Sequence, residues 1–217
     1  MSSHFQSSNL AIATLLLYLA PSTLYHSFFP SSLAQAQTTQ NQQSELKQLL
    51  PIGIRQLEEG QFQEAFKTFR KVVSLQRKQG DQLAQGITLG TMGEIFLNLE
   101  KYPHSLETYK QSLRIFQQLG KDHDQAIILN NIGVVYKIQG QYDLALDYYQ
   151  QALTLQLELD NRKDAATNLN NIGEIYRIQG QYPQALDHYQ NAGLSPLWLL
   201  QWKLIRFLVI DGDAIAN

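Results

Sequence analysis

The sequence contains no cysteine, so the chain can form no disulfide and offers neither a thiol nucleophile nor a thiolate ligand for zinc. Short motifs of the common enzyme classes are also missing. There is no Gly-x-Ser-x-Gly elbow, no His-Glu-x-x-His, no phosphate-binding loop and no dinucleotide glycine fingerprint. We therefore expect no catalytic site, no metal site and no cofactor, and predict that the protein is not an enzyme.

Positive charge is sparse and scattered. The chain has 17 Lys and Arg residues against 19 Asp and Glu residues, for a net charge of −2. A nucleic-acid-binding surface needs Lys and Arg gathered in one patch or stripe to neutralise phosphates, and no segment collects them. DNA and RNA are therefore not expected as partners. Hydrophobic residues make up 44 % of the chain, a proportion typical of a folded protein.

The N-terminal segment has no charged side chain before Glu45. The apolar run Leu10–Ala20 has the length of a signal-peptide core and is too short to span a bilayer comfortably. Small residues at Ala34 and Ala36 suit signal peptidase. We therefore predict that residues 1–36 are a signal peptide, that the mature chain begins near Gln37, and that the protein is exported to the periplasm or the medium.

The alternatives are an uncleaved N-terminal membrane anchor and a buried helix, since no Lys or Arg precedes the apolar run. Residues 37–48 are expected to form a linker and the start of the first helix. Their first part, Gln37–Gln43, is polar and is expected to be flexible.

Most of the remaining chain is an internal repeat. Leu129–Ala152 (LNNIGVVYKIQGQYDLALDYYQQA) and Leu169–Ala192 (LNNIGEIYRIQGQYPQALDHYQNA) are identical at 17 of 24 positions. The pattern continues backwards at the same spacing, to copies that begin at Leu89 and Leu49. An array over 49–192 is therefore predicted, with repeats 49–88, 89–128, 129–168 and a partial repeat 169–192.

Each repeat is predicted to contain two helices. Leu129, Ile132 and Tyr136 recur at helical spacing, and so do the apolar residues that follow Gly140. Glycines at 60, 140 and 180 are expected to end the first helix, and prolines at 103 and 183 to begin the second. The small Gly133 is expected to let the helices approach closely, with Tyr149 filling the space beside it. One helix pair buries too little to be stable, so neighbouring repeats must complete the core.

These positions resemble the signature of the tetratricopeptide repeat. The residues that match it are Leu129, Ile132, Gly133, Tyr136, Gly140, Tyr142, Ala145, Tyr149 and Ala152. The spacing of 40 residues exceeds the usual value of about 34, and the stretch 119–133 resembles the long-helix subtype typified by kinesin light chains, as found in secreted bacterial arrays. The resemblance implies an all-α fold, a right-handed α-solenoid of stacked helix-turn-helix units, with seven complete helices and a shortened eighth.

The resemblance also implies a function. Arrays of this family bind protein or peptide partners in a concave groove lined by the first helix of each repeat. We therefore predict a non-catalytic binding scaffold. The alternative is that the chain is the sensor or adaptor part of a larger protein whose C-terminal effector domain, such as a caspase-like peptidase, is missing.

Residues of the predicted groove follow from the same resemblance. In the light-chain subtype, asparagines on the first helix contact the bound peptide, since an amide can pair with a peptide backbone without reading its sequence. The alternative is that these asparagines make contacts between helices and bind nothing. Glu94 and Leu97 lie at related positions in the second repeat. The candidate residues are Asn130, Asn131, Val134, Lys137, Asn170, Asn171, Glu174 and Arg177.

Two other kinds of site are not expected. His104, His123 and His188 have no histidine or carboxylate at helical spacing that would complete a metal site. The carboxylate clamp of chaperone-binding relatives is also not matched, because Ile127 and Thr167 stand where the clamp has lysine. Its arginine position holds Asn171.

The C-terminal tail, residues 193–217, breaks the repeat. The apolar run Leu197–Ile210 contains both tryptophans of the protein. Three interpretations stay open: loss of the reading frame near Gly193, a membrane-surface or oligomer-forming helix, and a segment folded over the open end of the array. Contact with a membrane through Leu197–Ile210 is therefore one prediction, and the sequence does not determine the oligomeric state.

Overall fold

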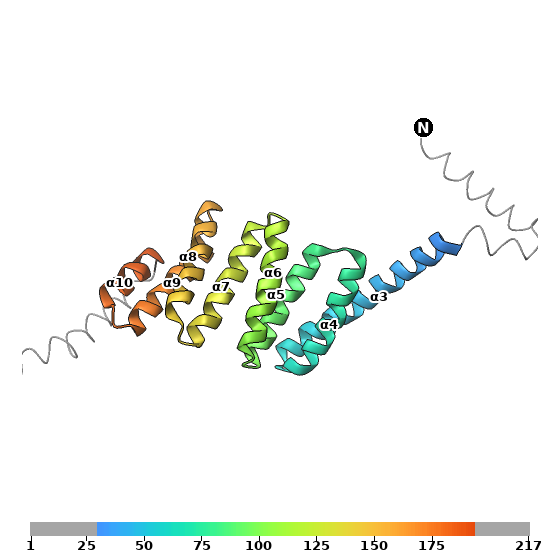
Figure 1. Cartoon of the computed structure of the whole chain (residues 1–217), viewed down its shortest axis with the longest axis horizontal. Helices are drawn as coiled ribbons and strands as arrows, with labels where there is room; N and C mark the ends of the chain where they lie inside the picture. Colours follow the sequence, from blue (N-terminus) through green and yellow to red (C-terminus); the bar gives the residue numbers. More distant parts are fainter. Residues whose placement is uncertain (1–29, 194–217) are drawn as a thin grey trace, which may run out of the picture. The chain divides into compact units, whose positions relative to one another are not determined.

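The computed structural model describes residues 30–193, and the side chains of residues 37–193. Over this range the chain forms eight α-helices joined by short turns (Figure 1). The apolar run of the predicted signal peptide and the C-terminal tail lie outside the described residues. The helices are α3 (Pro30–Glu58), α4 (Phe62–Gln79), α5 (Gln82–Asn98), α6 (Tyr102–Gln118), α7 (Asp122–Ile138), α8 (Tyr142–Glu158), α9 (Arg162–Ile178) and α10 (Tyr182–Asn191).

The chain divides into two compact units, Met1–Gln48 and Leu49–Asn217. The boundary falls where the array was predicted to begin. The flexible linker predicted at Gln37–Gln43 is wrong, because these residues are helical within α3. Glutamine is a good helix former, and no glycine interrupts this stretch. The predicted cleavage site after Ala36 also falls within α3.

In the second unit the helices alternate as first and second members of hairpin pairs, and each packs on the one before it from α4 to α10. Within residues 30–193 seven helices are complete and α10 is short, as predicted. First helices begin at Gln82, Asp122 and Arg162, so the predicted spacing of the repeat is confirmed. The boundaries of the repeats differ from the prediction. Each helix pair begins on the N-terminal side of the predicted start at Leu89, Leu129 or Leu169. A period specifies the distance between copies and not the point at which one copy begins.

The turn after each first helix uses a left-handed residue. The predicted glycines at 60, 140 and 180 have φ of 71°, 72° and 74°. At Gly140 the backbone N–H donates to Lys137 O at 3.0 Å, and the next N–H donates to Tyr136 O at 2.9 Å, which satisfies the last carbonyls of α7. Glu100 holds the equivalent place with φ of 57°, and Asp160 is left-handed with φ of 51°.

Close contact between the helices of a pair depends on Gly133. A Cβ atom built there would lie 2.6 Å from Tyr149 Cε1, so only glycine fits against that ring. Tyr149 is fully buried, and burial raises the pKa of its hydroxyl. The same arrangement recurs at Gly93, where the Cβ would lie 2.6 Å from Tyr109. The predicted role of Gly133 is therefore confirmed, and α5 packs against α6 through the same kind of contact.

Candidate functional site

The exposed sides of the first helices α5, α7 and α9 form one surface, which we call the first-helix face. Two contacts join α7 to α9 across it. Asn171 Nδ2 donates to Asn130 Oδ1 at 2.9 Å, and Lys137 Nζ donates to Glu174 Oε2 at 2.7 Å. The structure therefore joins half of the predicted groove residues, two on each helix, between α7 and α9.

These contacts change how the asparagines are interpreted. The amide oxygen of Asn130 accepts from Asn171, and its Nδ2 donates to Asn131 Oδ1 at 3.3 Å. Asn130 and Asn171 thus form a link between helices, the alternative that the sequence left open. Lys137 is four-fifths buried and paired with Glu174, so the ammonium group already has a partner.

The other candidates have varied surroundings. Val134 is half-buried and packs against the core shared by α8 and α9. The amide oxygen of Asn170 is buried and has no hydrogen-bond partner among the described residues. Arg177 is exposed near the end of α9, close to Tyr189. The role of these three residues in binding stays a prediction. Asn131 lines a hollow that was not predicted from the sequence.

A hollow of about 230 Å³ opens on the first-helix face between α5 and α7. Its floor is made by Phe116 and Ile128, which are buried, and by the backbone at Gly90. Ile87 and Ile127 stand at its rim with exposed fractions of 53 % and 39 %. Four polar side chains complete the lining: Thr91, Glu94, Asp124 and Asn131.

Asn131 and Glu94 of this lining were predicted from the sequence as groove residues, whereas Ile87, Gly90 and Asp124 were not. A signal was present in the repeat itself. In the register of the repeat, Gly90 stands where the next two copies have Asn130 and Asn170. A glycine in place of a side chain on an exposed helix face marks a gap, although its depth depends on the neighbouring helix.

The electrostatic character of the hollow is acidic. Glu94 and Asp124 carry no ion pair within residues 37–193. Lys137, the cation that α7 contributes to this face, is engaged by Glu174. A ligand entering the hollow therefore meets two carboxylates without an ion pair. Lys137 does not neutralise them, because its ammonium group is bound by Glu174.

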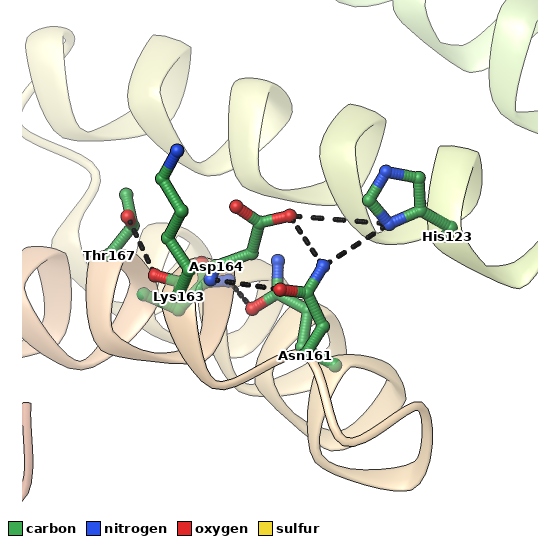
Figure 2. A network of polar contacts seen from close by, with 7 residues as sticks. His123, Asn161, Lys163, Asp164 and Thr167 are labelled. Carbon is green, nitrogen blue, oxygen red and sulfur yellow. Dashed lines mark hydrogen bonds and ion pairs between the residues drawn. The ribbon is translucent and has the colours of Figure 1, made fainter.

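A second polar cluster joins the ends of α7 and α9 (Figure 2). His123 Nδ1 lies 4.0 Å from Asp164 Oδ2 and 3.4 Å from Asn161 Nδ2. Asn161 also caps α9, because its Oδ1 accepts from Asp164 N at 3.3 Å. The sequence found no carboxylate at helical spacing from His123, and its partner lies one repeat away in the chain. No group of acidic and histidine side chains suited to a metal ion occurs in the described part of the chain.

Comparison with known proteins assigns the fold to a family. A family model described as tetratricopeptide repeat matches residues 53–118 and 124–192. The chain belongs to the tetratricopeptide repeat family. Its fold is the predicted all-α solenoid, and such repeats are scaffolds for protein–protein interaction. No match is found among curated proteins.

Solved structures agree on the fold of this tetratricopeptide repeat protein. Aspartyl phosphate phosphatase F from Bacillus subtilis is similar with a TM-score of 0.66 and 16 % identity, covering 80 % of this chain and 48 % of that one. Kinesin light chain repeats from Podosopora anserina give a TM-score of 0.58 at 16 % identity, covering 69 % and 74 %. MamA gives 0.53 at 16 % identity, covering 68 % and 75 %. At this identity the likeness concerns the fold, which is of the kinesin-light-chain type expected from the long repeat.

Proposed function

We propose that this protein is a non-catalytic scaffold that holds an extended segment of a partner protein on the first-helix face. The observation that carries the proposal is the hollow between α5 and α7, where two half-exposed isoleucines lie beside the carboxylates of Glu94 and Asp124, which have no ion pair among the described residues. Apolar side chains gathered with polar groups in one concavity are the usual make-up of a binding site.

The surface around the hollow suits a peptide. First helices stack side by side, so equivalent positions on α5, α7 and α9 recur along a line that an extended chain can follow. Exposed side chains on that line differ in character: Ile87 and Ile127 are aliphatic, and Thr167 is polar. A ligand with mixed side chains would find matching contacts at each repeat.

Among the predicted asparagines, Asn131 is the one we assign to peptide contact. Its oxygen accepts from Asn130, whereas its Nδ2 donates no hydrogen bond within the described residues. Asn130 and Asn171 hold α7 to α9 in this proposal, and the pair of Lys137 and Glu174 does the same.

The test begins with selection of peptides from a random display library, with the full chain as bait. Binding of the selected peptides is then measured for two variants on the face, Asn131→Arg and Thr167→Arg. The matched controls are Leu144→Arg and Leu157→Arg, at exposed positions of α8. We expect the face variants to weaken binding by about tenfold or more, which is ~1.4 kcal/mol, and the controls to change it little. Peptides that lose affinity only for the α8 variants would place the site elsewhere and refute the proposal.

We further propose export of the protein, with removal of residues 1–36, from the apolar run and the small residues that follow it. N-terminal sequencing of the protein from its host tests this, and a chain that still begins at Met1 would favour the membrane-anchor alternative. In the described part of the chain, no helix combines the length and apolarity needed to cross a bilayer.

A further inference from the structure

An amide ladder runs across the first-helix face and stops at α5. Between α9 and α7 it is made by Asn171, whose Nδ2 donates to Asn130 Oδ1 at 2.9 Å. One repeat earlier the donor is still present, because Asn131 of α7 corresponds to Asn171. The acceptor is missing, since the residue that corresponds to Asn130 is Gly90.

The position that lacks this side chain lies at the hollow. Gly90 lines it, and a Cβ built at Gly90 would lie 3.0 Å from Ile128 Cδ1, the flexible end of that side chain, and 3.6 Å from Ser112 Oγ. The repeat thus lacks at Gly90 the side chain that the following repeats carry as asparagine, and Ile128 Cδ1 would have to shift slightly to admit one. Asn131 lines the same hollow, and its Nδ2 donates no hydrogen bond within the described chain.

The size of the opening points to a single side chain. Its volume of about 230 Å³ is below the range of about 300–1,000 Å³ that is typical of small-molecule sites. The floor is apolar, made by Phe116 and Ile128, and the rim is formed by Ile87 and Ile127. An aliphatic side chain such as leucine or isoleucine would remove this apolar surface from water.

The charges at the rim of the hollow indicate which residue of the ligand should lie next to its aliphatic side chain. Glu94 is exposed and Asp124 is half-buried, and neither has an ion pair among the described residues. Two unpaired carboxylates beside an apolar socket favour a ligand with a positive charge next to its apolar group, and disfavour one with a negative charge.

We propose that the hollow between α5 and α7 is a specificity pocket for a partner peptide in which a leucine or isoleucine is flanked by lysine or arginine. The aliphatic side chain enters above Gly90, the cation meets Glu94 and Asp124, and Asn131 Nδ2 donates to a peptide carbonyl. This inference rests on the proposed function, because it names the ligand chemistry at one point of the first-helix face.

The test compares three pools of synthetic peptides of equal length and otherwise random sequence. One pool carries Leu or Ile followed by Lys or Arg, the second carries Leu or Ile followed by Asp or Glu, and the third carries Asn or Ser followed by Lys or Arg. Each pool is captured on the immobilised full chain and the retained peptides are sequenced. We expect the first pool to be enriched about tenfold or more over both others, and the enrichment to fall as salt is raised.

The decisive variant is Gly90→Asn, which inserts the side chain found at the same place in the next two repeats. It should restore the acceptor for Asn131, occupy part of the hollow and abolish the enrichment, while the fold is retained, because only the flexible end of Ile128 has to move to admit the new Cβ. Glu94→Gln and Asp124→Asn should each reduce the preference for the first pool over the second. Glu158→Gln, the same change of charge at an exposed position of α8, is the matched control and should leave the preference unchanged.

The outcomes separate this inference from the function on which it rests. If Gly90→Asn binds the first pool as the parent does, while Asn131→Arg and Thr167→Arg lose the peptides of the random library, the scaffold function stands and the pocket is refuted. If neither the pools nor the random library yield a ligand for the face, both fail. Self-association of the full chain that Gly90→Asn removes, measured by sedimentation, would make a second copy the occupant and overturn the peptide proposal.

Discussion

Replacement of Gly133 by alanine tests whether the tyrosine–glycine contact determines how closely the helices of a pair approach. The added methyl group would lie 2.6 Å from Tyr149 Cε1 and 2.7 Å from Cδ1, well inside van der Waals contact. Tyr149 is fully buried, so its ring has no solvent-filled space into which to move. The helices of this pair must therefore separate or the ring must leave its preferred rotamer.

The expected cost follows from two opposed effects. Alanine is favoured over glycine within a helix by about 1 kcal/mol, whereas overpacking of a core costs about 1–3 kcal/mol. At 2.6 Å the overpacking cost should lie at the upper end, so Gly133→Ala should lower the free energy of unfolding by about 1–2 kcal/mol. For a chain of this size that corresponds to a decrease in Tm of about 2–8 °C.

Gly173→Ala is the matched comparison, because the same tyrosine contact is looser there. The methyl group would lie 3.0 Å from Tyr189 Cε1, and that ring is 8 % exposed near the end of the array. The gain in helix propensity should nearly offset the smaller clash. Both variants are measured by thermal unfolding followed by far-ultraviolet circular dichroism. A Gly133→Ala protein as stable as the parent, or a larger loss for Gly173→Ala, would refute the reasoning.

Three further changes test other parts of the array. Glu100→Gly should raise the free energy of unfolding by about 0.5–1 kcal/mol, since Glu100 has φ of 57°; an unchanged or lower Tm contradicts this. Asn168→Ile should cost about 1–3 kcal/mol, because it leaves Gln156, the buried acceptor of Asn168, without its donor. The double variant that also carries Gln156→Phe should recover most of that loss, measured by chemical denaturation. A double variant whose loss equals the sum of the two single losses would contradict the pairing of Asn168 with Gln156. Burial lowers the pKa of His188 below 6.5, so as the pH falls through 6.5 the unfolded chain takes up the proton first and stability declines. His188→Tyr, which copies Tyr148 of the preceding repeat, should remove that part of the decline, and an identical pH profile would show that His188 does not cause it.

The repeat explains why so much of the fold could be predicted. Residues with a repeated role recur at the same offset: the glycine at Gly133 is present in all four copies and the turn glycine at Gly140 in three of them, so their purpose can be recognised without coordinates. The linker prediction failed at Gln37–Gln43 because polarity alone does not prevent a helix. Glutamine-rich segments lack apolar periodicity and still have high helix propensity.

The site could be predicted only in part, since its contacts join residues one repeat apart. The sequence placed Asn130 and Asn171 on one face but left open whether they bind a ligand or each other. Their bond of 2.9 Å is a consequence of stacking α9 on α7. His123 and Asp164 are a second case, with 4.0 Å between atoms that belong to different repeats.

The sequence by itself determined the all-α repeat fold, the spacing of its copies, the left-handed glycine turns and the first-helix face as the candidate surface. These depend on local periodicity and on backbone conformations that only certain residues adopt. Tertiary structure alone decided which polar groups on that face are paired and where it is open. The surface at Gly90 becomes part of a hollow because α7 places Asn131, Ile127 and Ile128 around it. The distance between neighbouring helices, which decides this, is a property of packing and is not encoded at any one position of the chain.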